Sequence, residues 1–228
     1  MALLTANILL QLARSTGQER LLESARDGMC HKKVGNFFRT QTTPTTCGFQ
    51  TIAIMRESLD IRSETDGEME MEIGSENKEE GSDVLLLAAA ADAGIVDKSS
   101  VLKSGLTLHE FSRVLKFLLP PSFSLSITHA SNKDSDKSKI LTALSSPSSR
   151  IAVNYDMTIA GQTPPFGKPE LGGHLSPLVA YHNVSDSVLV LDVWYDTEPV
   201  WIPWERLWRG MNAADKASGC ERGFVVIC

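Results

Sequence analysis

Cys47 lies in the segment TQTTPTTCGFQT and is followed directly by a glycine. A cysteine thiol becomes a nucleophile when it loses its proton, and the positive end of a helix dipole favours that loss. The segment FQTIAIMRESL after the glycine carries apolar residues at spacings of three, four and seven, which fit one face of a helix. We therefore predict that Cys47 lies at or just before a helix N-terminus.

The chain also contains the partners that a nucleophilic cysteine needs. His174 precedes the alternating segment SPLVAYHN, and Asp192 lies in a second alternating segment, SVLVLDVWY, across the turn NVSD. The position midway between them, Asn183, falls in that turn. Both side chains therefore leave one face of a hairpin if even residues pair with even residues.

In such a site the imidazole takes the thiol proton, and the carboxylate holds the imidazole in the required tautomer. The side-chain amide of Gln41, six positions before the cysteine, is a candidate donor to the oxyanion of a tetrahedral intermediate. Each residue also has a structural interpretation, because cysteines and strand histidines are more often ordinary core residues. The remaining histidines, with weaker patterns, are His31, His109, His129 and His182.

The order of the predicted elements indicates an α+β fold, in which helices precede an antiparallel sheet. Apolar periodicity predicts helices over residues 8–29, 49–59, 84–94, 107–119 and 135–146. Thr107 and Glu110 have the spacing of a capping box at the start of the fourth helix. Alternating patterns predict strands over residues 150–157, 176–183, 187–195 and 222–227, and a strand passing into a short helix over 199–212.

Length and composition are those of a single soluble domain, residues 1–228. The net charge of −6 comes largely from residues 58–83, which we predict to be a flexible acidic insertion. That stretch lacks EF-hand spacing, and we expect no metal site. The charge pattern indicates no nucleic-acid partner, and no apolar run reaches the roughly 18 residues of a membrane span. The N-terminus lacks signal-peptide features and the four cysteines lack disulfide spacing, so we expect a cytoplasmic protein.

Several separated segments resemble those of the phytochelatin synthase family. NFFRTQTTPTTCGFQTIAIMRESL is similar to the family's active-site segment, and GGHLSPLVAY is similar to its histidine segment. VLVLDVWYDTEPVWIPWERLWRGMN and ASGCERGFVVI are similar to its aspartate strand, its tryptophan-proline stretch and its closing strand. The resemblance runs from about Ser24 to Ile227, with the motifs in the family's order.

This resemblance implies a papain-like cysteine peptidase fold. It implies Cys47 as nucleophile, His174 as general base and acid, Asp192 as the residue that orients the imidazole, and Gln41 in the oxyanion hole. Substrate-binding residues implied in the same way are Gly48, Gly173 and Tyr195.

The implied reaction is that of a glutathione γ-glutamylcysteinyltransferase. The cysteine attacks the cysteinyl-glycine bond of glutathione, glycine leaves, and a second glutathione accepts the γ-glutamylcysteinyl group to give a phytochelatin. No tightly bound cofactor is expected. Cadmium or zinc would enter as thiolate complexes of glutathione, because soft thiolates prefer such metals. The expected partners are glutathione and these complexes, without nucleic acid or membrane, and with a homodimer left open.

The sequence departs from the family pattern at several places. Trp194 and Tyr195 stand where the family usually has alanine and a substrate-binding arginine, and PPFGKPEL is inserted before the histidine segment. The cysteine-rich domain that follows the catalytic domain in plant members is expected to be absent. These departures leave two alternatives open, a hydrolase of glutathione or its S-conjugates without transfer and an inactive member that acts as a binding module.

Overall fold

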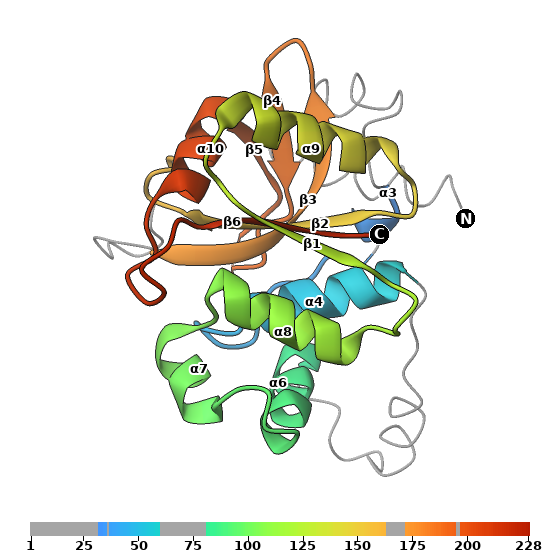
Figure 1. Cartoon of the computed structure of the whole chain (residues 1–228), viewed down its shortest axis with the longest axis vertical. Coiled ribbons are helices and arrows are strands. Elements are labelled where there is room, and N and C mark those ends of the chain that lie inside the picture. Colours follow the sequence, from blue (N-terminus) through green and yellow to red (C-terminus); the bar gives the residue numbers. More distant parts are fainter. Residues whose placement is uncertain (1–31, 36, 60–80, 163–171, 195–196) are drawn as a thin grey trace.

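The computed structural model describes residues 32–35, 37–59, 81–162, 172–194 and 197–228, and the structural statements below concern those residues (Figure 1). The helices are α3 (Lys32–Gly35), α4 (Cys47–Ser58), α6 (Ser82–Asp92), α7 (Lys98–Ser104), α8 (Leu108–Leu118), α9 (Lys133–Ser145) and α10 (Trp204–Asn212). The strands are β1 (Leu125–His129), β2 (Arg150–Asp156), β3 (Gly173–His182), β4 (Ser187–Val190), β5 (Val200–Pro203) and β6 (Gly223–Ile227).

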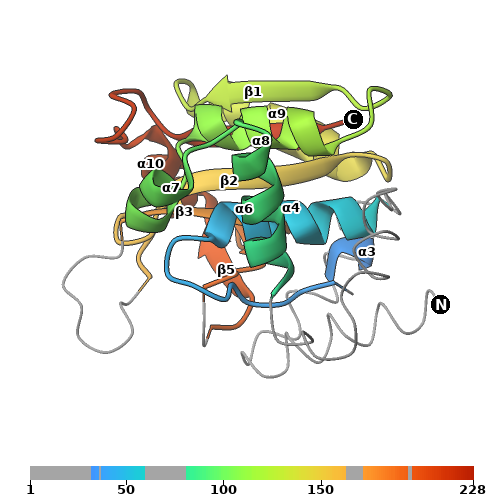
Figure 2. The same ribbon diagram turned by 90° about the horizontal axis from the view of Figure 1, so that it is seen from below.

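The strands form one antiparallel sheet in the order β1-β6-β2-β3-β4-β5, which confirms the predicted α+β class. Helices α4, α6, α7 and α8 lie on one side of the sheet, and α9 and α10 lie on the other (Figures 1 and 2). Successive residues of β2 point to opposite faces, so Ala152 packs in the core beneath α4 and α8 while Val153 packs in the core beneath α9 and α10. The sheet is therefore buried on both faces.

Helix α4 lies in the core and is attached to the sheet near both ends. Every residue of the helix except Glu57 is buried. The hydroxyl of Thr51, one turn after the start, donates to the carbonyl of Leu175 in β3 (3.0 Å). At the other end, Arg150 of β2 donates to the hydroxyl and the carbonyl of Ser58 (2.8 and 2.6 Å). These bonds hold the start of α4 in a defined place beside β3.

The hairpin of β3 and β4 contains a β-bulge that decides which side chains share a face. Near the turn, His182 pairs with Ser187, so even residues face odd residues. Beyond the register shift, Leu178 pairs with Val190, and even residues face even residues. Because side chains alternate along a strand, the extra residue of the bulge reverses which residues of β3 share a face with the even-numbered residues of the opposite segment. The predicted histidine and aspartate share a face because of this bulge.

Most predicted elements are confirmed, including the helix that begins at the cysteine, the capping box of Thr107 and Glu110, and the hairpin. The short elements α7 and β1 were not predicted. They are largely exposed, so burial imposes little pattern on their sequences. The predicted helix over residues 84–94 buries only one face.

The boundaries predicted for the acidic insertion, residues 58–83, were too wide. Ser58 belongs to α4 and Ser82 already belongs to α6, and Asp83 is fully buried rather than solvated. A carboxylate at this position gains from the N-terminus of α6, which is why the helix begins inside the acidic stretch. Residues 60–80, like the predicted helix over 8–29, lie outside the described residues.

Replacing Arg150 with alanine should lower the free energy of unfolding by about 3 kcal/mol, because buried acceptors on α4 lose their charged donor. Urea unfolding followed by circular dichroism measures the change. Arg113→Ala, at an exposed position of α8, is the control and should change stability by less than about 0.5 kcal/mol. Equal stabilities for the two variants would contradict the anchoring role of Arg150.

Candidate functional site

Cys47 is the first residue of α4, as the sequence predicted, and its side chain is buried. The preceding residue, Thr46, takes the N-cap position. Backbone groups of Gly48 and Leu175 interact with the thiol. The sulfur therefore lies at the positive end of a helix dipole and next to β3, one residue from the strand position of His174.

His174 is the second residue of β3 and is completely buried against Asp192. Its Nε2–H donates to Oδ1 of Asp192 at 2.9 Å. Its Nδ1 is buried and makes no hydrogen bond to the described residues. The imidazole nevertheless lies close enough to Cys47 to act on the pKa of its thiol. Asp192 thus occupies one ring nitrogen, and the other is left without a hydrogen bond from the described part of the chain, in a site that also contains the thiol.

The electrostatics favour the charged forms of this pair. Burial by itself raises the pKa of the Cys47 thiol, but the hydrogen bond and the charge of His174, with smaller contributions from the backbone of Leu175 and Gly48, bring it below its ordinary value. Burial lowers the pKa of His174, but hydrogen bonds to Asp192 and Cys47 outweigh burial and raise the pKa to about 10. These effects favour a thiolate beside an imidazolium, and a thiolate is the form of cysteine that can attack a carbonyl carbon.

Further contacts fix the orientation of the carboxylate and the ring. Asp192 also accepts hydrogen bonds from the side-chain amide of Gln162 (2.6 Å) and from the backbone N–H of Trp194 (3.0 Å). The rings of Tyr155 and Trp194 meet the imidazole edge-to-face, with centroids 5.9 and 6.0 Å away. These four groups leave Asp192 and His174 little rotational freedom. Residue type alone did not single out Gln162 in the sequence, where it lies 30 positions before Asp192.

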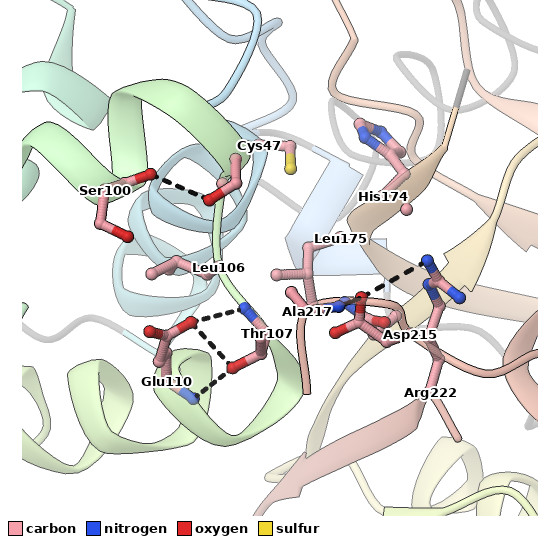
Figure 3. Close-up of a pocket in the computed structure, with 14 residues that line it drawn as sticks. Cys47, Ser100, Leu106, Thr107, Glu110, His174, Leu175, Asp215, Ala217 and Arg222 are labelled. Carbon is pink, nitrogen blue, oxygen red and sulfur yellow. Dashed lines mark hydrogen bonds and ion pairs between the residues drawn. The ribbon is translucent and has the colours of Figure 1, made fainter. Parts of the chain in front are cut away.

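Cys47 and His174 line a pocket with a volume of about 230 Å³. In the close-up, Glu110 of α8 lies on one side of the pocket and Arg222, just before β6, lies on the other (Figure 3). Arg222 donates to the carbonyls of Ala213 and Ala214 and forms an ion pair with Asp215 at 3.7 Å. The pocket therefore offers a guanidinium and carboxylates together with the Cys47 thiol. The sequence motif RGF contained this arginine, but no local signal showed that it would reach the site.

Gly173 allows the arginine to approach. A β-carbon at position 173 would lie 3.0 Å from both Nε and Nη2 of Arg222, so the guanidinium would have to shift by a few tenths of an ångström to accept a side chain there. Gly48 has a different role in the structure, because its missing side chain makes room for Leu106 and Leu175 in the core. Of the three predicted substrate-binding residues, Gly173 lines the pocket, Gly48 lies behind it, and Tyr195 lies outside the described residues.

Gln41 is buried in the loop before α4. Its backbone N–H donates to the carbonyl of Val193 (2.7 Å), and its side-chain Nε2 donates to the carbonyl of Thr43 (2.6 Å). The first bond attaches the loop to the segment that follows Asp192. Gln41 does not line the pocket, and its place in the oxyanion hole stays a prediction.

The described residues contain neither a metal-binding cluster nor a helix that could span a membrane. No group of three or more histidine, cysteine, aspartate or glutamate side chains there could hold a metal ion. None of the helices described is both long and apolar enough to cross a membrane.

A buried thiol paired with an imidazole on a helix and an antiparallel sheet is the arrangement that enzymes with a cysteine nucleophile use. The model of the phytochelatin synthase family matches residues 3–224. The chain therefore belongs to the phytochelatin synthase family.

Curated proteins give the same result. Glutathione gamma-glutamylcysteinyltransferase 1 of Lotus japonicus is 24% identical over 220 residues, which cover 94% of this chain and 39% of that protein. Glutathione gamma-glutamylcysteinyltransferase 3 of the same plant is 36% identical over 92 residues, which cover 40% of this chain and 18% of that protein. The Triticum aestivum glutathione gamma-glutamylcysteinyltransferase 1 is 43% identical over 56 residues, covering 24% of this chain and 11% of that protein. The chain thus spans at most 39% of the length of these relatives.

Alkylation by iodoacetamide should show the lowered pKa of Cys47 directly. The rate should rise with pH as the thiolate forms, with a midpoint below the ordinary thiol value of 9.0. In His174→Ala the midpoint should move upward and the neutral-pH rate should fall at least about tenfold, because only the smaller backbone contributions then oppose the effect of burial on the thiol. Peptide mass spectrometry between about pH 5 and pH 10 gives the rate at each cysteine.

Cys220, which is exposed, serves as an internal control in the same samples. Its rate should be the same in the parent and in His174→Ala. A Cys47 rate that is no faster than that of Cys220 at neutral pH, and that His174→Ala leaves unchanged, would refute the ion pair.

Proposed function

We propose that the protein is a glutathione γ-glutamylcysteinyltransferase with a papain-like fold, in which Cys47, His174 and Asp192 act as a catalytic triad. The observation that carries this proposal is the thiol, imidazole and carboxylate arranged in sequence at the start of α4, in a chain that belongs to the phytochelatin synthase family. The names of the curated relatives support the substrate. Retention of all three groups in one buried line argues against an inactive binding module.

In the proposed reaction, the Cys47 thiolate attacks the carbonyl carbon of the cysteinyl-glycine bond of glutathione. The His174 imidazolium gives its proton to the departing glycine nitrogen, and a γ-glutamylcysteinyl thioester remains on the sulfur. The neutral imidazole then takes a proton from the α-amino group of a second glutathione as that nitrogen attacks the thioester. The product is a phytochelatin, and the thiolate is restored. Asp192 stabilises the imidazolium in both steps.

The tetrahedral intermediates carry an oxyanion that needs hydrogen-bond donors. The backbone N–H of Cys47 lies at the helix N-terminus and is one candidate. The amide of Gln41 has one N–H beyond the one that bonds Thr43, and it is the second candidate.

Arg222 supports recognition of a substrate carboxylate. The family arginine expected after the aspartate is replaced here, but Arg222 brings a guanidinium to the pocket from a distant part of the chain. Glu110 and Asp215 add negative charge around it. A pocket with both signs fits an amino acid head group, which carries an ammonium and a carboxylate together, as the γ-glutamyl residue of glutathione does.

Heavy-metal ions belong to the substrate in this proposal. Cadmium or zinc bridges glutathione thiolates, and the resulting complex serves as acceptor. The described residues contain no cluster that would hold the ion in the protein.

Product analysis tests the function. The parent protein should convert glutathione with cadmium into glycine and oligomers longer than glutathione, while Cys47→Ser should form neither, because a serine hydroxyl at this position lacks the thiolate. Liquid chromatography with mass spectrometry identifies the products. If only γ-glutamylcysteine and glycine form, the reaction is hydrolysis and not transfer. If glycine release does not depend on Cys47, the proposal is contradicted.

Arg222→Lys should raise KM for glutathione about tenfold while changing kcat by less than about threefold, because an ammonium keeps the charge but cannot bind a carboxylate through two parallel hydrogen bonds. Steady-state release of glycine measures both constants. Arg209→Lys, at an exposed position of α10, is the matched control. An unchanged KM in Arg222→Lys would assign carboxylate binding to another group.

A further inference from the structure

Asp83 is a buried carboxylate that lies outside the lining of the catalytic pocket. It is the second residue of α6. Its oxygens accept three hydrogen bonds, from the backbone N–H of Thr42 (2.8 Å), the hydroxyl of Thr42 (2.5 Å) and the hydroxyl of Thr46 (2.5 Å). A buried carboxylate is costly unless such bonds satisfy it, so the contact with these threonines is specific.

The two threonines are the ends of the turn that precedes α4. Thr42 follows Gln41, the candidate oxyanion donor, and Thr46 precedes Cys47. One carboxylate group therefore joins both ends of the turn. Inside the turn, the hydroxyl oxygen of Thr46 also accepts a hydrogen bond from the backbone N–H of Thr43 (3.3 Å), so the loop is cross-linked through polar contacts.

The negative charge of Asp83 is compensated locally. Arg39 lies near it, and the pKa of Arg39 is raised chiefly by its hydrogen bond with Glu57 and also by the charge of Asp83. Arg39 donates to the hydroxyl of Ser82 (2.9 Å), the first residue of α6. The N-terminus of α6 adds the favourable end of its dipole. These contacts connect the loop that precedes α4 with α4 itself, through Glu57, and with the start of α6, through Ser82 and Asp83.

We propose that Asp83 is a positioning residue that holds Gln41 and Cys47 in the relative arrangement that nucleophilic attack requires. It acts through the turn and touches neither substrate nor reacting atoms. Without it, the turn is free to relax, and the sulfur moves relative to the imidazole. A misplacement of about 1 Å costs up to a hundredfold in rate. The inference rests on the proposed function for its biological meaning, but the reactivity of the thiol tests it without glutathione.

Asp136 provides a matched control. It is also a buried aspartate in the first turn of a helix, α9, on the opposite side of the sheet (Figure 1). It accepts three hydrogen bonds, from the backbone N–H of Ser131 (3.0 Å) and of Asn132 (3.2 Å) and from the indole N–H of Trp208 (3.1 Å). Its loss should lower stability about as much as the loss of Asp83 does, but it should leave the loop before α4 intact.

The experiment compares Asp83→Ala, Asp83→Asn and Asp136→Ala in the full chain. The iodoacetamide rate of Cys47 at neutral pH and the Tm of each variant are measured. Asp83→Ala should lower the rate ten- to a hundredfold, on the order that misplacement predicts, whereas Asp136→Ala should keep the parent rate despite a similar loss of Tm. Asp83→Asn should recover to within about threefold, because the amide oxygen can accept two of the bonds and its N–H can donate to the Thr42 hydroxyl.

A parent-like rate in Asp83→Ala, or equal losses in Asp83→Ala and Asp136→Ala, would overturn the proposal. If Asp83→Ala does not fold, Thr42→Val and Thr45→Val provide the test within the same turn. The hydroxyl of Thr42 bonds Asp83, while that of Thr45 makes no hydrogen bond to the described residues. Only Thr42→Val should slow alkylation, by about threefold, and equal rates for the two variants would refute the role of Asp83.

The outcomes for Asp83 and for the proposed function are separable. Thiol reactivity that depends on Asp83, without conversion of glutathione, would retain the positioning role and remove the substrate. Conversion of glutathione by a protein whose thiol reactivity does not depend on Asp83 would retain the proposed function and remove the positioning role.

Discussion

The electrostatic interaction between the Cys47 thiol and the His174 imidazole, which favours their charged forms, is the interaction on which the proposed site depends. Either charge alone would be costly in the core, and each is stabilised by the other. Asp192 adds the hydrogen bond that keeps the imidazole protonated and fixes its orientation. The pairing therefore requires that three residues from different elements remain within contact, and much of the architecture serves that requirement.

The elements meet this requirement by rigid attachment. Helix α4 brings the sulfur and is attached to the sheet near its start and at its end, through Thr51 and Arg150. The hairpin of β3 and β4 brings the imidazole and the carboxylate, and its bulge places them on one face. The loop before α4 is closed by Asp83 on one side and joined to Val193 on the other. Precision at the nucleophile thus comes from several polar contacts that are far apart in the sequence.

Under the proposed function, the pocket compensates for a local departure from the family pattern. A guanidinium expected next to the aspartate is replaced, yet Arg222 reaches the same pocket from the start of β6. Gly173 favours this approach, because a β-carbon there would lie in tight contact with the guanidinium. Carboxylate recognition depends on where a charge lies in space, so its position along the chain is free to differ.

The sequence by itself was sufficient for the place of Cys47 at a helix start, for the hairpin segments that bring His174 and Asp192 together, and for the α+β class. Those features follow from residue type, helical and alternating periodicity, and motifs, all of which are local. The helix that begins at Cys47 and the hairpin that carries His174 were predicted for this reason, whereas the short exposed elements α7 and β1 were not.

Only the tertiary structure decided which residues pair across the hairpin, the approach of Arg222 to the pocket and the burial of Asp83. Asp83 belongs to an acidic stretch whose composition predicted solvation, and it is buried because threonines 41 and 37 positions earlier supply its hydrogen bonds. A side chain's partners at that distance depend on how helices and strands pack together. Local periodicity carries no record of that packing, and so these features became visible only in the folded chain.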